Sequence, residues 1–190
     1  MYQAEPDPYC YPGSTILKNK ADLRDEGALE EFENAMTFAR AAEPLPAGRF
    51  SVSHDRAIHR HLFQDVYSWA GRFRTVRLTK GRSTFCYPEH VAREMQRLFS
   101  WLKDGRFLQD RSPYEFAAGA AHCLAELNAI HPFREGNGRT QLTFLALVAE
   151  HAGHPLDLDR LDAEAALDAM IQSFNGEEKP LRVLIEGLVS

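Results

Sequence analysis

The sequence predicts an all-α fold with one short β-hairpin. Apolar residues recur at three- and four-residue steps along most of the chain, which is the spacing of helices that bury one face. Residues 72–78 instead alternate with a period of two and are followed by Lys80-Gly81, a turn signal, so a hairpin is predicted there. The 190 residues suffice for one sizeable core, and we expect residues 1–190 to form a single domain.

Composition and charge narrow the class of protein. The chain is 44% hydrophobic and 26% charged, unlike a disordered or membrane protein. Its net charge of −5 argues against direct nucleic-acid binding, which normally requires a basic surface. Cys10, Cys86 and Cys123 are far apart and form neither a metal-ligand pair nor a disulfide framework, as expected in a reducing compartment. Without an apolar signal core or a bilayer-length segment, we expect a cytoplasmic protein with no membrane partner.

The first 20 residues are expected to form an extended arm, because three prolines interrupt them. The first helix is predicted over residues 25–42, where apolar residues form one face before further prolines end the helix. That face consists of Leu29, Phe32, Ala35, Met36 and Ala39.

The second helix is predicted to run from Ser51 or Ser53 to about residue 66, and it carries His54, His59 and His61. Two interpretations of these histidines are open, a metal cluster and a solvated helix face. We favour the solvated face, because their spacing does not place all three on one side of a helix.

Residues 72–87 are expected to form a flap built from the hairpin. A lone hairpin is marginally stable, so it must pack on helices while its outer edge stays free. A free edge can bind an extended segment of another protein by strand addition, and the alternative is a structural flap that closes a gap in the core. The residues expected to dock the target are Thr79, Lys80, Gly81, Arg82, Ser83 and Thr84.

The rest of the chain is predicted to be helical. The Ser-Pro-Tyr-Glu sequence at residues 112–115 is a typical helix start, with serine as the cap and glutamate three residues on. The helix that follows is apolar nearly all round, so we place it at the centre of the core. The predicted helices span residues 88–104, 112–130, 137–152, a segment from Asp159 or Asp162 through Ile171, and a segment from Pro180 onward.

The loop between the two most apolar helices concentrates the chemistry of this chain. It reads His131-Pro132-Phe133-Arg134-Glu135-Gly136-Asn137-Gly138-Arg139. Unpaired N–H groups at the start of the second helix can bind an anion, and the two glycines let the backbone approach it. Phe133 is expected to turn inward and anchor the loop.

Three side chains of the loop have complementary chemistry. A neutral His131 can accept a proton from an incoming hydroxyl. Glu135 is the single carboxylate that Mg²⁺ typically takes beside phosphate oxygens. Arg139, on the first turn of the helix, can contact a phosphate with two N–H groups. Together they predict phosphoryl or nucleotidyl transfer to a hydroxyl.

These residues resemble the signature of the Fic family, H-x-F-x-[D/E]-G-N-G-R-x-x-R, and match every specified position from His131 to Arg139. The arm and the segment Tyr67-Ser68-Trp69-Ala70-Gly71 with the hairpin are also similar to that family. The resemblance implies a Fic-type helical core with one hairpin flap. It also implies transfer of AMP from ATP to a Tyr, Ser or Thr hydroxyl of another protein.

The resemblance further implies residue roles and partners. His131 would be the general base, Glu135 would hold Mg²⁺, and Arg139 would contact the triphosphate. The phosphates would be bound by the glycine-rich part of the motif, so the nucleotide site comprises Phe133, Gly136, Asn137, Gly138 and Arg139. Compact bacterial Fic toxins pair with a separate small antitoxin, and some modify type II topoisomerase subunits, which makes such a subunit a candidate target.

One position departs from the signature, because Leu142 stands where the family has a second arginine. Losing that contact would cost on the order of 1.5–3 kcal/mol of phosphate binding. Three hypotheses follow: an AMP transferase, a phosphotransferase or user of another nucleotide, and a non-catalytic binding module. The phosphotransferase branch has lysine where Gly138 stands, which favours AMP transfer.

Members of the family can carry an inhibitory glutamate in the pattern [S/T]-x-x-x-E-[G/N]. Glu33-Asn34 has the right ending, but Leu29 occupies the Ser/Thr position, and the other matches are no better. We therefore expect no built-in inhibitor, and regulation by a separate protein.

Overall fold

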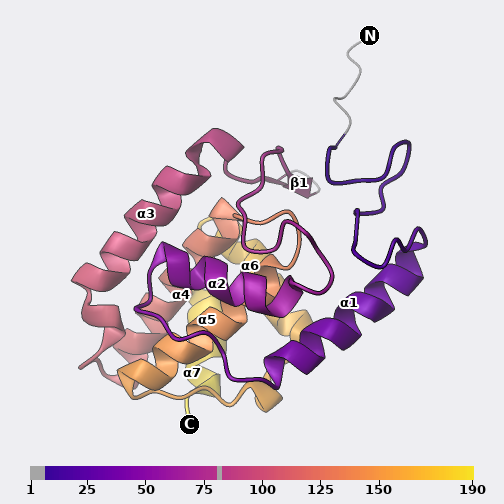
Figure 1. Cartoon of the computed structure of the whole chain (residues 1–190). Coiled ribbons are helices and arrows are strands. Elements are labelled where there is room, and N and C mark those ends of the chain that lie inside the picture. Colours follow the sequence, from indigo (N-terminus) through magenta and orange to yellow (C-terminus); the bar gives the residue numbers. More distant parts are fainter. Residues whose placement is uncertain (1–6, 81–82) are drawn as a thin grey trace.

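The structure is a computed structural model that describes residues 7–80 and 83–190. It confirms the all-α prediction, because this part of the chain contains helices and one minimal two-stranded sheet (Figure 1). The elements are α1 (Glu26–Ala41), α2 (Val52–Phe63), β1 (Thr79–Lys80), β2 (Ser83–Thr84), α3 (Pro88–Asp104), α4 (Pro113–Ile130), α5 (Asn137–Ala152), α6 (Ala163–Phe174) and α7 (Lys179–Leu188), with short 3-10 turns η1 (Arg106–Leu108) and η2 (Leu158–Arg160).

Side chains in the sequence set the helix starts. Asp25, Ser51 and Asp162 each accept a hydrogen bond from a backbone N–H of the first turn of α1, α2 and α6. At α4 the predicted capping box is formed, since Ser112 and Glu115 satisfy each other's backbone N–H groups. The helix starts are therefore encoded locally.

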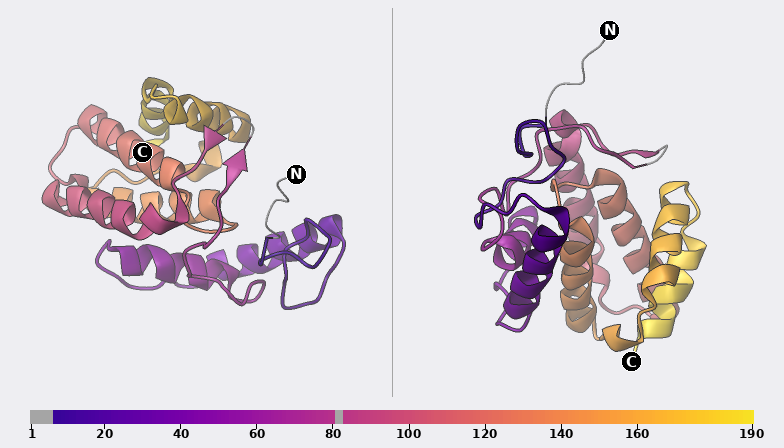
Figure 2. Two further views of the ribbon diagram at one scale, coloured as in Figure 1. Left: turned by 90° about the horizontal axis from the view of Figure 1, so that it is seen from above. Right: turned by 90° about the vertical axis from the view of Figure 1, so that its right-hand side faces the viewer.

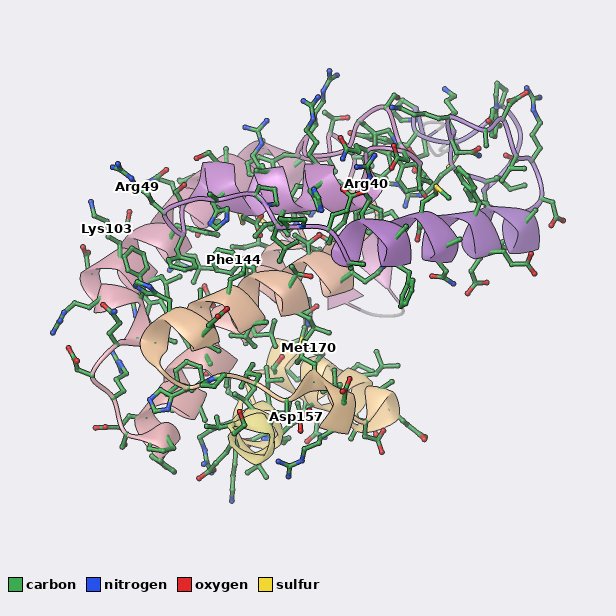
Figure 3. All side chains as sticks on the ribbon, turned by 60° about the horizontal axis from the view of Figure 1, so that its bottom comes forward. Arg40, Arg49, Lys103, Phe144, Asp157 and Met170 are labelled. Carbon is green, nitrogen blue, oxygen red and sulfur yellow. The ribbon has the colours of Figure 1, made fainter. Side chains whose placement is uncertain are left out.

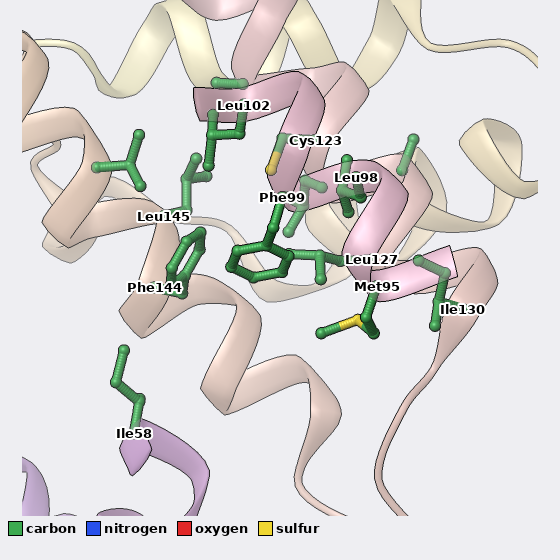
Figure 4. Packing of buried hydrophobic residues seen from close by; sticks show 14 of the residues in the cluster. Ile58, Met95, Leu98, Phe99, Leu102, Cys123, Leu127, Ile130, Phe144 and Leu145 are labelled. Atoms are coloured by element: carbon green, nitrogen blue, oxygen red, sulfur yellow. The ribbon is translucent and has the colours of Figure 1, made fainter. Parts of the chain in front are cut away.

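The helices form layers around α4 and α5 (Figure 2). One side is covered by α1 and α2, and the opposite side by α6 and α7. As the apolar sequence of α4 predicted, that helix contacts α3, α5, α6 and α7. The close view of the core shows Phe99 and Phe144 meeting from α3 and α5, with ring centroids 5.2 Å apart (Figure 4). The loop between α4 and α5 thus begins and ends on the most buried helices.

The outer layer is fastened at the C-terminal end of α1. Here Arg40, which is labelled in Figure 3, lies at the end of the helix. It donates from Nε and Nη2 to the two carboxylate oxygens of Asp65, at 2.6 and 3.0 Å. The ring of His61 lies 2.8 Å from the Arg40 carbonyl oxygen. These contacts hold α1 against α2 and fix the helix that faces the motif loop.

The hairpin is shorter than predicted. Thr79 pairs with Thr84 and Lys80 with Ser83, and residues 72–78 form no strand. The period-two pattern misled the prediction because the Arg74 side chain is buried and hydrogen-bonded to backbone, so it does not belong to a solvated strand face. Gly81 and Arg82, predicted in the docking segment, lie outside the described residues.

The arm returns to the body of the molecule. The Lys18 N–H donates to the Tyr9 carbonyl oxygen at 2.7 Å, which closes a small loop. The Tyr9 ring meets Trp69 edge-on, at 5.4 Å between centroids, and Asp7 pairs with Arg134 of the motif loop at 2.8 Å. The arm therefore buttresses the loop. Among the described helices, none combines the length and apolar character needed to cross a membrane.

Candidate active site

The motif loop begins at the C-terminal end of α4. His131 caps that helix in the left-handed conformation, with φ 48° and ψ 63°, which is uncommon for a residue other than glycine. Its N–H donates to the Leu127 carbonyl oxygen at 2.9 Å, and its own carbonyl oxygen accepts from Arg74 Nε at 2.7 Å. The backbone of the predicted base is thus held from both sides.

The imidazole of His131 is positioned by the flap. The Phe85 ring, directly after β2, stacks on it with centroids 3.9 Å apart and planes 17° apart. Phe85 itself is buried and meets Phe174 of α6 edge-on at 5.6 Å. The flap, α6 and the imidazole are therefore one packed group, which the sequence did not indicate.

The middle of the loop is anchored on α2. As predicted, Phe133 is buried, and it stacks on His59 with ring centroids 3.8 Å apart. His59 accepts the Gly71 N–H at Nδ1 and contacts the Glu135 carbonyl oxygen through Nε2 at 2.9 Å, so Nε2 carries the proton and donates. Burial lowers the pKa of His59 to about 4, which keeps the ring neutral.

The interpretation of the three α2 histidines as a solvated face is wrong. His54 and His59 are buried and His61 is half-buried, and each ring contacts a backbone carbonyl oxygen from another segment. The three histidines point in different directions from α2 because each one contacts a different segment of the chain. Within residues 7–80 and 83–190, no group of three or more His, Cys, Asp or Glu side chains is placed to hold a metal.

The glycine-rich part of the loop forms the start of α5. The Asn137 side chain accepts from the Phe133 N–H and donates to the Phe133 carbonyl oxygen, both at 2.9 Å, so it closes the loop instead of facing a ligand. Gly136 has φ 80°, and a side chain there would meet the Phe63 ring at 2.3 Å. Gly138 is exposed, with open space beside it. A phosphate can therefore approach the backbone of the first turn.

The side chain of Glu135 fits a shared magnesium site. It is 44% exposed, and its Oε1 accepts the Gly136 N–H at 2.8 Å, which orients the carboxylate. This one partly exposed carboxylate lies next to a helix start that a phosphate can approach. Such an arrangement matches the preference of Mg²⁺ for few protein ligands and several phosphate or water oxygens. The donor set thus fits the metal only together with a phosphate ligand.

Arg139 is paired with a residue that the sequence analysis discounted. Its Nη2 donates to Glu33 of α1, and its Nη1 donates to Thr37 at 3.2 Å. The other Glu33 oxygen accepts from the Tyr67 hydroxyl, and burial raises the pKa of Tyr67. The Glu135 carboxylate lies 3.9 Å from the same guanidinium. Arg139 is therefore surrounded by acceptors, and α1 is part of the site.

A pocket of about 450 Å³ lies beside these groups. Its walls come from the arm, α1 and the motif loop, including Leu17, Glu33, Glu135 and Arg139. Leu142 is half-buried on the second turn of α5. The structure thus brings Glu135, Gly138 and Arg139 to the N-terminal end of α5, and His131 at the other end of the loop contacts Phe85 of the flap.

Comparisons with known proteins identify the family to which this sequence is similar. The sequence profile described as the Fic/DOC family matches residues 49–149. A relative from Sinorhizobium fredii, named a probable protein adenylyltransferase, is 50% identical over 189 residues, which cover 99% of this chain and 98% of that protein.

Two solved structures have the same fold. The N-terminal Fic domain of a Bartonella quintana effector, with bound ADP, has a TM-score of 0.87 at 30% identity and covers 96% of this chain and 94% of that chain. The BepC protein of Bartonella tribocorum, with bound AMPPNP, has a TM-score of 0.87 at 28% identity, and the match covers 96% of each chain.

Proposed function

Because the chain belongs to the Fic/DOC family, we propose that it is a protein adenylyltransferase that moves AMP from ATP to a hydroxyl side chain of a target protein. The observation that carries the proposal is the loop between α4 and α5. It places an imidazole at one end and an open helix N-terminus with Arg139 at the other. The similar domains with bound ADP and AMPPNP support ATP as the substrate.

In the proposed reaction, the target hydroxyl oxygen attacks the α-phosphorus of ATP. The bond from that phosphorus to the oxygen bridging to the β-phosphorus breaks, and pyrophosphate leaves. The hydroxyl proton passes to a ring nitrogen of His131. The N–H groups at the start of α5 and the Arg139 guanidinium bind the negatively charged phosphates.

Glu135 is the residue proposed to hold Mg²⁺ together with the phosphates. Bound there, the ion would neutralise charge on the leaving pyrophosphate. Before that, the carboxylate keeps its orientation through the Gly136 N–H, so it needs little rearrangement to meet a metal.

The partners of the reaction belong to this proposal as well. The target would present a Tyr, Ser or Thr hydroxyl while its backbone pairs with the hairpin edge near Thr79 and Thr84. A type II topoisomerase subunit is a candidate target, and a separate small antitoxin is a candidate regulator. The cytoplasm is the proposed place of action, because Cys10, Cys86 and Cys123 are free thiols.

The test uses ATP labelled separately at the α- and γ-phosphates, with Mg²⁺, in a bacterial lysate. We expect α-label on a protein band with the wild type, and at least a ~10²-fold loss with His131→Ala. The control is His90→Ala, a half-buried histidine on α3 that lies outside the motif loop, and it should transfer normally.

Other outcomes identify the alternatives. Transfer of γ-label alone would indicate a phosphotransferase. Transfer only from another nucleotide would assign a new specificity to the site with Leu142. If no nucleotide transfers label, or if His131→Ala matches the wild type, the proposed activity is wrong and a binding module remains.

A further inference from the structure

Arg74 is the largest fully buried side chain among the described residues, with 2% of its surface exposed. It stands on the segment that leads from α2 into the hairpin. Long cationic side chains are almost never buried unless they are paired, so an arginine in this position needs an explanation. The residue is absent from the nine-residue motif and lies 57 positions before its partner His131.

The guanidinium of Arg74 donates to four backbone carbonyl oxygens. Two belong to the end of α4 and the motif loop: Nη2 donates to Ile130 at 3.1 Å and Nε to His131 at 2.7 Å. The other two belong to the two legs of the flap: Nη1 donates to Val76 at 2.6 Å, and Nη2 also donates to Cys86. One side chain therefore joins the base to both legs of the flap.

Backbone hydrogen bonds repeat this connection. The Arg74 N–H donates to the Pro132 carbonyl oxygen at 2.9 Å, and the Cys86 N–H donates to the Ala129 carbonyl oxygen at 3.0 Å. All four acceptors of the guanidinium are carbonyl oxygens. Those of Ile130 and His131 lie at the C-terminal end of α4, where the negative end of the helix dipole helps to compensate the positive charge of Arg74. Because Ile130 is the last residue of α4, its carbonyl oxygen has no partner within the helix. Arg74 satisfies it.

The phosphate half of the loop is held by different contacts. Asn137 closes the loop on Phe133, and His59 binds the Glu135 carbonyl oxygen. None of these bonds includes Arg74. The loop is thus fixed by two independent systems, one at the nucleotide end and one at the base.

On this basis we propose that Arg74 is a positioning residue that holds the His131 backbone in its left-handed conformation and keeps the flap in register with it. A target docked on the hairpin would then present its hydroxyl at a fixed distance from the imidazole. This inference rests on the proposed AMP transfer. It separates the transfer step, which needs both the flap and the base, from nucleotide binding, which needs neither.

The experiment compares Arg74→Lys and Arg74→Met with Arg93→Lys and Arg93→Met, the control arginine being 70% exposed on α3. Lysine keeps the charge, but its single ammonium cannot reach four acceptors arranged for a planar fork. Three quantities are measured: the rate of α-label transfer, the affinity for an ATP analogue, and hydrogen exchange along the chain.

We expect both Arg74 variants to transfer AMP about 10²-fold more slowly, as for a small misplacement of a catalytic group. Analogue affinity should change by less than about twofold, because the helix N-terminus is untouched. Exchange should accelerate at the amides of Arg74 and Cys86 and in residues 129–131, while α5 stays protected. The Arg93 variants should match the wild type in all three.

Results that differ from these expectations would contradict the proposed role of Arg74. Wild-type transfer by Arg74→Lys would show that the fork is not needed. Equal losses in analogue affinity and transfer, or faster exchange over the whole chain, would make Arg74 a general stabiliser. Failure of the wild type to transfer AMP would refute the proposed function, while the exchange pattern would still show whether Arg74 joins the flap to His131.

Discussion

Glu33 forms an ion pair with Arg139. One carboxylate oxygen accepts from the arginine and the other from the Tyr67 hydroxyl, and only 10% of the glutamate side chain is exposed. A phosphate that binds Arg139 must share or displace this carboxylate. If Arg139 binds the nucleotide as proposed, the phosphates would compete with Glu33 of the same chain, whereas the sequence analysis predicted no built-in inhibitor.

Replacing Glu33 by Gln tests this competition. The amide keeps an acceptor for Tyr67 but removes the charge, so Arg139 becomes available to phosphate. Because the Arg139 side chain is 37% exposed, we expect a modest gain, about fivefold in ATP-analogue affinity by calorimetry. Glu31→Gln on the exposed face of α1 is the control. Unchanged or weaker affinity would mean that Glu33 positions Arg139 for the nucleotide.

Such partners could not be predicted from the sequence. The residues of the motif are contiguous, so their types and spacing identified the loop directly. Glu33 and Arg74 lie 106 and 57 positions from Arg139 and His131, and neither belongs to a local pattern. Only the packing of α1 and of the flap against the loop brings them together. The contact of the Asn137 side chain with the Phe133 backbone was likewise not predictable from the sequence.

At the scale of elements, α2 carries several buried titratable groups, and two of them, Asp55 and His59, lie one turn apart. Burial raises the pKa of Asp55 from 3.8 to about 7 and lowers that of His59 from 6.5 to about 4. Between about pH 4 and 7, folded Asp55 keeps a proton that the unfolded chain releases. Between about pH 4 and 6.5, unfolded His59 binds a proton that the folded ring excludes.

Asp55 and His59 have opposite effects on how the free energy of unfolding changes with pH. As pH rises, Asp55 lowers the free energy of unfolding and His59 raises it, each by at most about 1.4 kcal/mol per pH unit. Asp55→Asn should therefore remove the downward slope and make stability rise more steeply between pH 4.5 and 6.5. Urea unfolding at several pH values measures this. Parallel curves for the variant and the wild type would contradict a raised Asp55 pKa, and Asp104→Asn on α3 serves as the exposed control.

The helices were largely predictable, because their caps and apolar faces are local. Predicted and observed bounds agree within a few residues for α1, α3, α4 and α5. The hairpin was predicted too long because the alternation in residues 72–78 was taken for strand pairing. The histidines of α2 were misjudged because their acceptors come from other segments.

At the scale of the whole molecule, α4 is the central helix of the core. It contacts α3, α5, α6 and α7, and Phe116, Ala117 and Ala120 on it have no exposed surface. Opening α4 would require most of the core to separate. The hairpin has only two residue pairs and lies at the periphery.

Hydrogen exchange should follow this hierarchy. Amides in the middle of α4 should exchange slowest, at rates set by global unfolding, and those of β1 and β2 fastest among bonded amides. Mass spectrometry of proteolytic fragments measures both. If α6 or α7 exchanged more slowly than α4, the core would not be organised around α4.

The arm and α1 provide partners for a loop made much later in synthesis. Asp7 pairs with Arg134, and Glu33 pairs with Arg139. When the first third of the chain leaves the ribosome, these two ion pairs cannot yet form, since translation proceeds from the N-terminus at about 5–20 residues per second. A truncated nascent chain therefore cannot assemble the site. Under the proposed function, activity would begin only after the segment beyond residue 139 has emerged.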